Sequence, residues 1–449
     1  DGKYILVNRW PGVGAAMDMA LIAADTGQIT VIGKTPARYN GRFSPDGKYI
    51  LFDGGETPMA SPKDPQDIYV MLADGSQETA IVKSPANDYN AFWSPDGSHI
   101  LFLSDRSGSS SLWSLRVENG RADGEPQLVQ HNFPGFITDV TSDGTVYYTV
   151  RSSVGDVYVA GLDPDTGKLT GTPQRQSEVG INRGPVWSRD GNTLAFFGNC
   201  AANNSFRDQP DIVLRPSSGA AQVIKGKFHG SCMMNPLAWF PGGRSLLVRQ
   251  TPRLHALDID TGASRPVFPG FDGRGHGVLA PDGKSLYHFG WDGVGGLFRR
   301  DEAGNTTLVV PAKAYSNEAK HYSLSLSPDG RQLAFLDSGR VVIVSTAGGP
   351  IRDLFQPKAG LATPGPLLRT VWSHDGRFIY FTATADEKSP AARLWRVAAS
   401  GGEPQLVLEL PGVAILAPAI HPNGKQIAFS TDQTRVEHWQ LRNLMSQLR

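Results

Sequence analysis

The chain has 449 residues, of which 43 are basic and 43 are acidic, and charged residues make up 19% of it. Nucleic-acid-binding proteins usually have an excess or a cluster of basic side chains, so this balance excludes nucleic acid as an expected partner. No apolar run approaches the roughly 18 residues of a membrane-spanning helix, and we expect no membrane span in this segment.

A Ser-Pro-Asp-Gly phrase followed by a short apolar strand recurs along nearly the whole chain. The clearest copies are FSPDGKYILF from Phe43, WSPDGSHILF from Trp93, WSRDGNTLAF from Trp187, LSPDGRQLAF from Leu326 and WSHDGRFIYF from Trp372. With the Asp of each Asp-Gly step, or its substitute, as origin, the copies fall at positions 1, 46, 96, 143, 190, 242, 282, 329, 375 and 423. The intervals run from 40 to 52 residues, and such a strand-rich period is typical of a propeller blade.

Each copy predicts a hairpin turn and then a strand. Pro presets φ at a turn position, Asp can bond its own downstream backbone, and Gly supplies a positive φ. Large apolar residues stand four positions after each origin, from Ile5 through Ile50 to Ile427, and Phe stands six positions after the origin in six copies. This period of two is that of a strand.

In chain order, the amino end supplies strands two to four of a blade, at residues 4–7, 19–23 and 29–32. Complete blades follow, each with a third strand such as residues 67–71 and a fourth strand after a further turn. The carboxyl end supplies strands one to three and finishes at residues 436–441. Because a blade has four short antiparallel strands, the two ends overlap, and the closure of the ring stays open.

The repeat resembles that of the TolB-type, WD40-like β-propellers, whose unit has a Trp-Ser-Pro-Asp-Gly core, then a strand ending in Phe, then an Ile-Tyr-Val strand. The resemblance covers essentially all 449 residues. It implies an all-β fold in which residues 1–449 form a single β-propeller domain of about 8 to 10 four-stranded antiparallel blades. We expect residues 441–449 to form a short C-terminal helical tail.

The resemblance alone does not choose a function. The family includes periplasmic interaction proteins, sensor domains fused to kinases or transcription regulators, and the propellers of prolyl oligopeptidase-like enzymes. Because the first residues fall inside a repeat, we expect further sequence upstream, such as a signal peptide or another domain.

The two cysteines, Cys200 and Cys232, lie in loops that the blade topology places on one face. Cys200 follows the second strand of its blade, and Cys232 lies in the loop that leads into the next blade. We predict a disulfide between them, with two free, partly buried thiols as the alternative. A disulfide here stabilises by about 3 to 4 kcal/mol in the loop-entropy model and implies an oxidising compartment, so we expect a periplasmic or extracellular protein.

The residues that enter each inner strand line the mouth of the central channel, and a ligand site is expected to draw one or two of them from each blade. We find candidates by counting back six positions from each origin and adding the neighbours. The ligand-binding candidates, which are rich in amide, aromatic and cationic side chains, are Tyr39, Asn40, Tyr89, Asn90, Asn182, Arg183, Asn235, His276, His321, Tyr322 and Arg369.

Two interpretations of these candidates stay open. The Tyr-Asn pairs of two successive blades can stack against and hydrogen-bond a sugar, a peptide or a partner's loop, or they are a structural corner that the repeat copies. Arg183 and Arg369, with His276 and His321, can recognise an anionic group, or they are solvated channel residues. The Ser-Pro-Asp-Gly turns are expected on the face opposite this mouth and specify the scaffold.

Motifs of enzyme chemistry are missing from the sequence. It has no Gly-x-Ser-x-Gly nucleophile elbow, no His-Glu-x-x-His pair, no haem-attachment motif and no phosphate loop, so we assign no catalytic residue, cofactor or metal. The acidic loops at residues 163–165 and 258–260 occupy hairpin positions where Asp and Gly serve the turn, which weighs against calcium. Paired carboxylates facing each other across the channel stay open, because the sequence does not show which acids meet.

The function that these observations favour is non-enzymatic binding. We expect a TolB-like propeller that binds a protein partner or a small polar or carbohydrate ligand at the channel mouth, either alone or as the sensor part of a longer protein. The alternative is a propeller enzyme, a polysaccharide lyase or a hydrolase, with its active site in the central channel.

Overall fold

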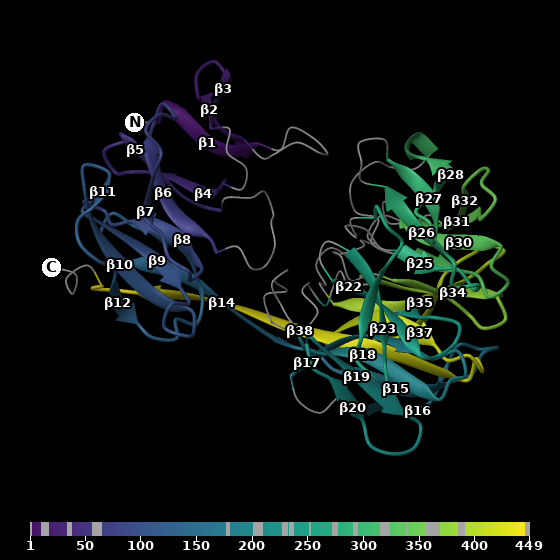
Figure 1. Ribbon diagram of the computed structural model, residues 1–449. Helices are drawn as coiled ribbons and strands as arrows, with labels where there is room; N and C mark the ends of the chain where they lie inside the picture. Colours follow the sequence, from purple (N-terminus) through teal and green to yellow (C-terminus); the bar gives the residue numbers. More distant parts are fainter. Residues whose placement is uncertain are drawn as a thin grey trace. The chain divides into compact units, whose positions relative to one another are not determined.

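The computed structural model describes residues 2–9, 18–33, 38–55, 65–176, 180–200, 210–226, 232, 238–250, 253–271, 277–290, 295–314, 324–337, 340–355, 369–384 and 391–444. These residues form 38 β-strands and one turn of 3-10 helix, η1 (Ala312–Ala314). The strands pair mainly in four-stranded antiparallel sheets, which confirms the all-β propeller fold (Figure 1).

The chain divides into two compact units, which we describe separately. Unit 1 comprises residues 1–152 and 435–449, and unit 2 comprises residues 153–434. In pairing order, the sheets of unit 1 are β1 (Tyr4–Arg9), β2 (Asp18–Ala23) and β3 (Ile29–Gly33); β4 (Arg38–Phe43), β5 (Tyr49–Gly54), β6 (Asp67–Leu72) and β7 (Thr79–Val82); β8 (Asp88–Trp93), β9 (His99–Ser104) and β10 (Ser111–Glu118), with β11 (Arg121–Ala122) and β12 (Gln127–Gln130) both on β10; and β13 (Phe136–Val140), β14 (Val146–Val154) and β38 (Gln426–Leu441).

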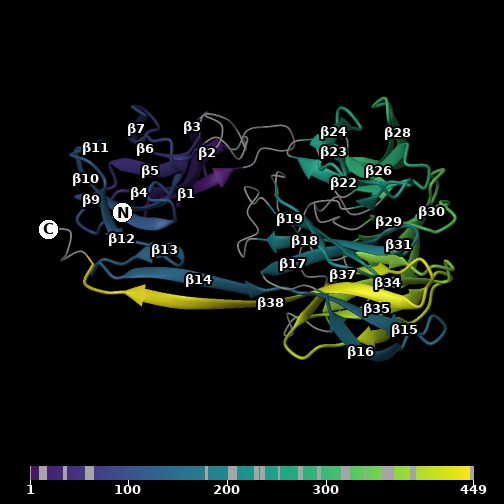
Figure 2. The same cartoon turned by 60° about the horizontal axis from the view of Figure 1, so that its bottom comes forward.

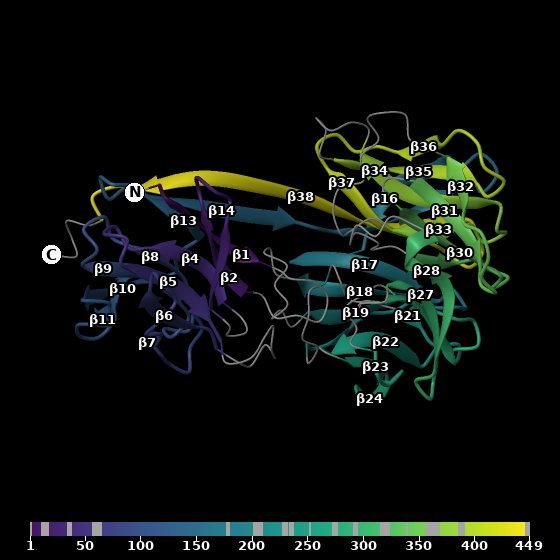
Figure 3. The ribbon, with the colours of Figure 1, turned by 90° about the horizontal axis from the view of Figure 1, so that it is seen from above.

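Unit 2 contains five sheets of consecutive strands and one antiparallel sheet of non-consecutive strands, which we call the closing blade. The five sheets are β17 (Ile181–Trp187), β18 (Thr193–Cys200), β19 (Asp211–Pro216) and β20 (Gln222–Ile224); β21 (Ala238–Trp239), β22 (Ser245–Gln250), β23 (Arg253–Asp258) and β24 (Ser264–Val267); β25 (Gly277–Leu279), β26 (Ser285–Gly290), β27 (Gly296–Asp301) and β28 (Thr306–Pro311); β29 (Leu324–Leu326), β30 (Gln332–Asp337), β31 (Arg340–Ser345) and β32 (Arg352–Phe355); and β33 (Thr370–Trp372), β34 (Phe378–Thr384), β35 (Ala392–Ala398) and β36 (Gln405–Leu408). Figure 3 shows β17, β18 and β19 side by side in the first of these sheets.

The closing blade pairs strands near the end of the chain with strands from its first half. It contains β37 (Ala414–Ile420), β38, β15 (Val157–Leu162) and β16 (Leu169–Arg175), and Ala428 of β38 lies opposite both Ala419 of β37 and Val159 of β15. Figure 2 shows the yellow β38 beside β15 in this sheet. Since β37 also contacts β33 and β17, this sixth blade closes the ring of unit 2.

The blades are grouped differently from the single ring that the repeats suggested. The repeats predicted one ring of about 8 to 10 blades over residues 1–449, whereas the chain is grouped in two units and the ring of unit 2 has six blades. The physical reason is that β37 and β38 complete their blade with β15 and β16, and not with the strands at the amino end. Leu441 is the last residue of β38, and residues 445–449 of the expected helical tail lie outside the described residues.

The apolar positions predicted for the second strand of each blade are buried in most blades, and the residues between them are buried as well. The residues four positions after the origins that are at most 1% exposed are Ile50, Ile100, Leu194, Leu246, Leu286, Leu333, Ile379 and Ile427. The six Phe residues two positions further on are equally buried. Ile5 and Tyr147 instead are 56% and 41% exposed, because β1 and β14 belong to the end sheets of unit 1, whose apolar clusters pack them against one neighbouring sheet.

The Ser-Pro-Asp-Gly phrase folds into the predicted turn and also links neighbouring blades. In the copy at position 46, the Ser44 hydroxyl donates to the Asp46 carboxylate at 2.6 Å and accepts from the backbone N–H of Tyr49 at 3.0 Å. The Pro of one turn packs on the Gly of the next: a β-carbon on Gly283 would lie 2.5 Å from Cδ of Pro241. The phrase therefore specifies both the hairpin and the spacing of successive blades.

The predicted disulfide is present in unit 2. It joins Cys200, the last residue of β18, to Cys232, with their Cα atoms 6.0 Å apart. Both residues are buried in one apolar cluster with Ile181 and Trp239. The bond therefore fastens the blade that begins with β17 to the blade that begins with β21.

Candidate functional site

A cavity of about 400 Å³ lies among the inner strands of unit 2. We call it the channel cavity. Each of the six inner strands contributes to its wall, through Pro185 of β17, Ala238 of β21, Val278 of β25, Ser325 of β29, Val371 of β33 and Ala419 of β37. The cavity is therefore the central channel of the six-bladed ring.

The wall of the channel cavity is mainly apolar, and its hydroxyl groups are engaged with the protein. The Ser325 and Thr370 hydroxyls lie 2.9 Å apart, and the Thr370 hydroxyl donates to the carbonyl of Ala334 at 3.1 Å. Both side chains are buried. These hydroxyls hold β29 and β33 together across two blades, so they serve the scaffold first.

Arg369 is the charged residue of the channel cavity that the sequence analysis selected. It stands directly before β33, and its Nη2 atom lies 3.9 Å from the place that a β-carbon on Gly184 would take. Gly184 has a φ of 66° and leaves that space open. Burial lowers the pKa of Arg369 to about 10. Part of the surface of the residue stays accessible, and the residue lines the channel cavity.

The other end of the channel cavity is formed by the Ser-Pro-Asp-Gly turns. Arg189 and His374 replace the Pro of this phrase in two blades, and both are exposed. His421 replaces the Ser in a third blade: its Nδ1 atom accepts from the backbone N–H of Asn423 at 3.0 Å, and its Nε2 atom lies 3.1 Å from the carbonyl of Gly191. His421 thus joins two successive turns.

Arg183, the second predicted cation, has a structural environment. It is 1% exposed and forms an ion pair with Asp432 of β38 at 2.9 Å. It also donates to the Ser153 hydroxyl at 3.1 Å. These contacts fix β17 to the strands that close the ring. Next to it, Asn182 is buried and donates to the carbonyl of Gly180 at 2.9 Å.

The predicted Asn residues of unit 1 occupy bulges in inner strands. Asn40 and Asn90 have φ values of 55° and 56°, and the pairing of β4 and β8 shifts register beside them. Asn tolerates a positive φ better than most residues. Asn90 exchanges two hydrogen bonds with the backbone of Ile137, at 3.0 and 2.8 Å, and Asn40 donates to Asp53 at 2.8 Å. These contacts favour the structural interpretation of this pair.

The remaining candidates divide between unit 1 and the undescribed residues. Tyr39 lies in β4, and the Tyr89 hydroxyl lies 2.9 Å from that of Ser110. The candidates outside the described residues are Asn235, His276, His321 and Tyr322. Tyr39, Asn40, Tyr89 and Asn90 belong to unit 1, whereas the cavity of unit 2 contains Arg369.

Sequence reasoning missed Asp53, a buried carboxylate of unit 1. It lies on β5 and is 2% exposed. Burial raises its pKa to about 6, although hydrogen bonds from Asn40 and from the backbone of Asn90 and Ala91 act in the opposite direction. The repeat contains a signal for this residue: Asp53 directly follows Phe52, and the corresponding position in other copies holds an apolar residue, Leu103 or Phe197.

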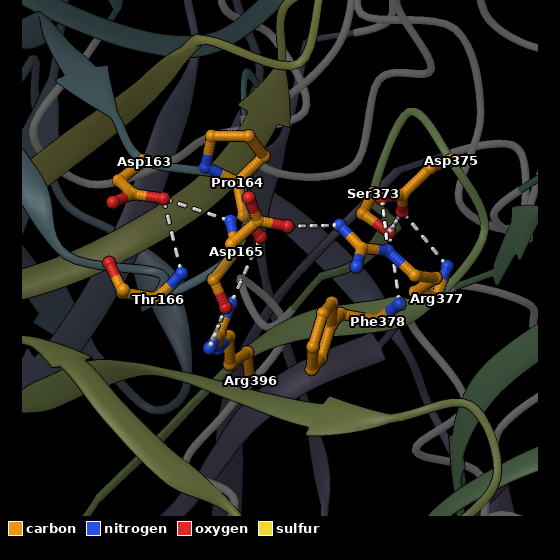
Figure 4. A network of polar contacts seen from close by, with 9 residues as sticks. All are labelled: Asp163, Pro164, Asp165, Thr166, Ser373, Asp375, Arg377, Phe378 and Arg396. Atoms are coloured by element: carbon orange, nitrogen blue, oxygen red, sulfur yellow. Dashed lines mark hydrogen bonds and ion pairs between the residues drawn. The ribbon is translucent and has the colours of Figure 1, made fainter.

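A polar network in unit 2 connects the closing blade to its neighbour (Figure 4). The Arg396 guanidinium donates to the carbonyls of Asp165 and Pro164 at 2.9 and 3.3 Å and lies 4.1 Å from the ring centroid of Phe378. The Asp165 carboxylate pairs with Arg377 at 2.7 Å. The network therefore holds the β15–β16 hairpin against the blade that begins with β33.

The acidic loop in this network has the geometry expected of a turn. The Asp163 carboxylate accepts from the backbone N–H groups of Asp165 and Thr166, at 2.9 and 3.1 Å. Asp258 makes the same two contacts in its own loop. Among the described residues there is no group of three or more His, Cys, Asp or Glu side chains that could hold a metal ion.

The described part of the chain contains no helix that is long and apolar enough to cross a membrane. The radial sheets, the closing blade and the central channel define the protein as a β-propeller. Residues 16–170 match the family model described as the TolB beta propeller domain. This match confirms, over residues 16–170, the TolB-type resemblance that the repeat indicated.

Solved structures of propellers are similar to this chain at low identity. A putative TolB from Agrobacterium tumefaciens is 16% identical, with 62% of this chain and 98% of that chain covered and a TM-score of 0.44. TolB from Acinetobacter baumannii is 14% identical, with 78% and 82% covered and a TM-score of 0.30. A comparison with curated proteins finds no match.

Proposed function

We propose that this protein is a non-enzymatic propeller that binds a small polar ligand in the channel cavity of unit 2. The observation that carries this proposal is the cavity itself, of about 400 Å³ and lined by all six blades. Small-molecule sites are concave, mostly apolar and provided with a few polar groups, and the channel cavity has this composition.

A protein partner at the same channel mouth is the second form of this proposal, supported by the TolB-type family. The volume of the cavity favours the small ligand, because a folded partner's contacts extend over a much larger surface. The enzyme alternative has less support: none of the described residues that line the cavity is Asp or Glu, so paired carboxylates for a lyase or a hydrolase are not found among them.

We also propose a periplasmic or extracellular location, as a separate protein or as the sensor part of a longer one. The Cys200–Cys232 bond supports this location, because disulfides persist in oxidising compartments. Alkylation of thiols in intact cells before lysis tests this location. Recovery of the two cysteines in alkylated form would show that they were free thiols in the cell and would refute the oxidising location.

Ligand-observed NMR tests the binding proposal. The probes are hexanoate, hexylamine, 1-hexanol and glucose, measured with the wild-type protein and with Ala238→Phe, which places a large side chain on the cavity wall. A second blocking variant, Val371→Phe, acts from the other side of the channel. We expect at least one probe to bind the wild type and to lose binding in both folded variants. Binding of no probe, or binding that both variants leave unchanged, would refute the proposal.

A further inference from the structure

Among the described residues that line the channel cavity, Arg369 is the charged one at the strand-start end. It precedes β33, and its guanidinium reaches toward Gly184 of β17, beyond the intervening β37. Arg183, its neighbour in this part of the ring, is paired with Asp432 and does not line the cavity. Two arginines line the cavity, Arg369 at the strand-start end and Arg189 among the turns.

The surroundings of Arg369 favour a negatively charged group. None of the described residues that line the cavity is acidic, and most of the wall consists of Pro, Val, Ala, Leu and Ile side chains. Burial in these surroundings lowers the pKa of Arg369 to about 10, so the side chain is still a cation at neutral pH. In a poorly solvated channel, an anion gains more from a guanidinium than it would in water.

The number of donors distinguishes a carboxylate from a more highly charged anion. A guanidinium has five N–H donors, so it can keep contacts within the protein and still donate two hydrogen bonds to a carboxylate. A phosphate needs further donors, and the Ser325 and Thr370 hydroxyls are engaged with each other and with Ala334. Arg189 and His374 stand at the other end of the cavity, among the turns.

From this geometry we infer that the channel cavity binds a small carboxylate with an apolar body, and that Arg369 recognises the carboxylate group. The inference rests on the proposed function and specifies its ligand. The apolar body lies along Val278, Val371 and Ala419, toward the turn end of the channel. The cavity of about 400 Å³ accommodates a drug-sized or smaller molecule.

Calorimetric titration with a matched set of probes tests this inference. Hexanoate, 1-hexanol and hexylamine share an apolar chain and differ in the charge of the head group. We expect hexanoate to bind the wild type more tightly than the other two. Arg369→Gln should weaken hexanoate about ten- to hundredfold, as expected for hydrogen bonds to a charged group, and should leave 1-hexanol within about threefold.

Arg189→Gln is the matched control, because Arg189 lines the same cavity but lies among the turns. It should change the affinity for hexanoate by less than about threefold. Arg369→Lys keeps the charge without the bidentate geometry and should bind hexanoate with intermediate affinity. The melting temperature of each variant shows whether it is folded, and the lysine variant carries the test if the glutamine variant does not fold.

Three results would overturn the inference and are distinguishable from one another. If 1-hexanol or hexylamine binds in the channel and is displaced by Ala238→Phe, while hexanoate does not bind, the ligand class is wrong but the proposed function stands. If hexanoate binds but depends on Arg189 and not on Arg369, the carboxylate lies at the turn end. If no probe binds, both the inference and the proposed function fail.

Discussion

The contact between Arg396 and the β15–β16 hairpin is predicted to hold the ring of unit 2 closed. Arg396 is 3% exposed and donates to the carbonyls of Asp165 and Pro164. Arg396→Met keeps most of the apolar side chain but removes these hydrogen bonds and the contact of the guanidinium with Phe378. A hydrogen bond to a charged group contributes about 1.5 to 3 kcal/mol, and a cation–π contact adds about 1. We therefore expect a loss of about 3 to 4 kcal/mol.

Arg352→Met is the matched control for this variant. Arg352 also donates from one blade to backbone carbonyls of the next, to Ala399 at 2.6 Å and to Ser400 at 3.2 Å, but it is exposed and lies away from the closure. Water replaces such exposed contacts at little cost, so we expect a loss below about 1 kcal/mol. Asp165→Asn removes the exposed ion pair to Arg377 and should cost equally little.

Hydrogen exchange in increasing urea measures these differences segment by segment. In Arg396→Met, the amides of β15 and β16 should lose protection at a lower urea concentration than those of β18 and β19. In the wild type, all four strands should lose protection together. Equal losses in Arg396→Met and Arg352→Met, or a loss in Arg396→Met that spares β15, would refute the assignment of Arg396 to the ring closure.

The remaining predictions concern a buried acid, a turn and the disulfide. Because burial raises the pKa of Asp53 to about 6, the folded protein binds more protons than the unfolded chain between about pH 4 and 6. Wild-type stability should therefore fall by up to about 3 kcal/mol as the pH rises through this window. Asp53→Asn should abolish that pH dependence of stability, measured by urea titration at each pH. Gly283→Ala places a β-carbon 2.5 Å from Pro241, whereas Gly262 has a similar positive φ and a β-carbon there would have nothing within 4 Å. Gly283→Ala should therefore lower the melting temperature clearly more than Gly262→Ala. Equal losses would contradict the contact between turns. Reduction of the disulfide should cost about 4 kcal/mol in the loop-entropy model, and an unchanged urea midpoint in dithiothreitol would show that the bond does not stabilise unit 2.

The blade was predictable from the sequence because its information is local. Turn residues, alternating apolar positions and the Phe of the second strand all lie within about ten residues of one another, in the manner of a repeat protein. The structure confirms these features in the buried Ile50 and Phe52 and in their counterparts in other blades. Likewise, the Cys200–Cys232 bond followed from the blade topology.

The ring closure was not predictable because its partners are distant in sequence. β15 pairs with β38, and Val159 lies opposite Ala428, more than half of the chain away. No local pattern distinguishes β15 and β16 from the third and fourth strands of any other blade. The repeat therefore indicated how many blades to expect but not which strands share the last one.

Of the candidate residues within the described part of the chain, Arg369 is the one that lines the channel cavity of unit 2. Counting back six positions from each turn found Asn90 and Arg369 at equivalent places in their blades, and Arg183 was added as the neighbour of Gly184, the equivalent residue of its blade. Only the structure shows that Asn90 bonds the backbone of Ile137, that Arg183 pairs with Asp432, and that Arg369 lines a cavity. The carboxylate that pairs with Arg183 lies 249 residues away in the sequence, so no local pattern could show this contact.

Fluorine NMR of the protein labelled with 5-fluorotryptophan tests the channel site most directly. Trp187 and Trp372 line the channel cavity, whereas Trp113 lies in unit 1, and Trp→Phe variants assign each signal. On titration with hexanoate, we predict shifts at Trp187 and Trp372 and none at Trp113. Shifts at Trp113 with no change at Trp187 and Trp372 would place the ligand outside the channel and contradict the account.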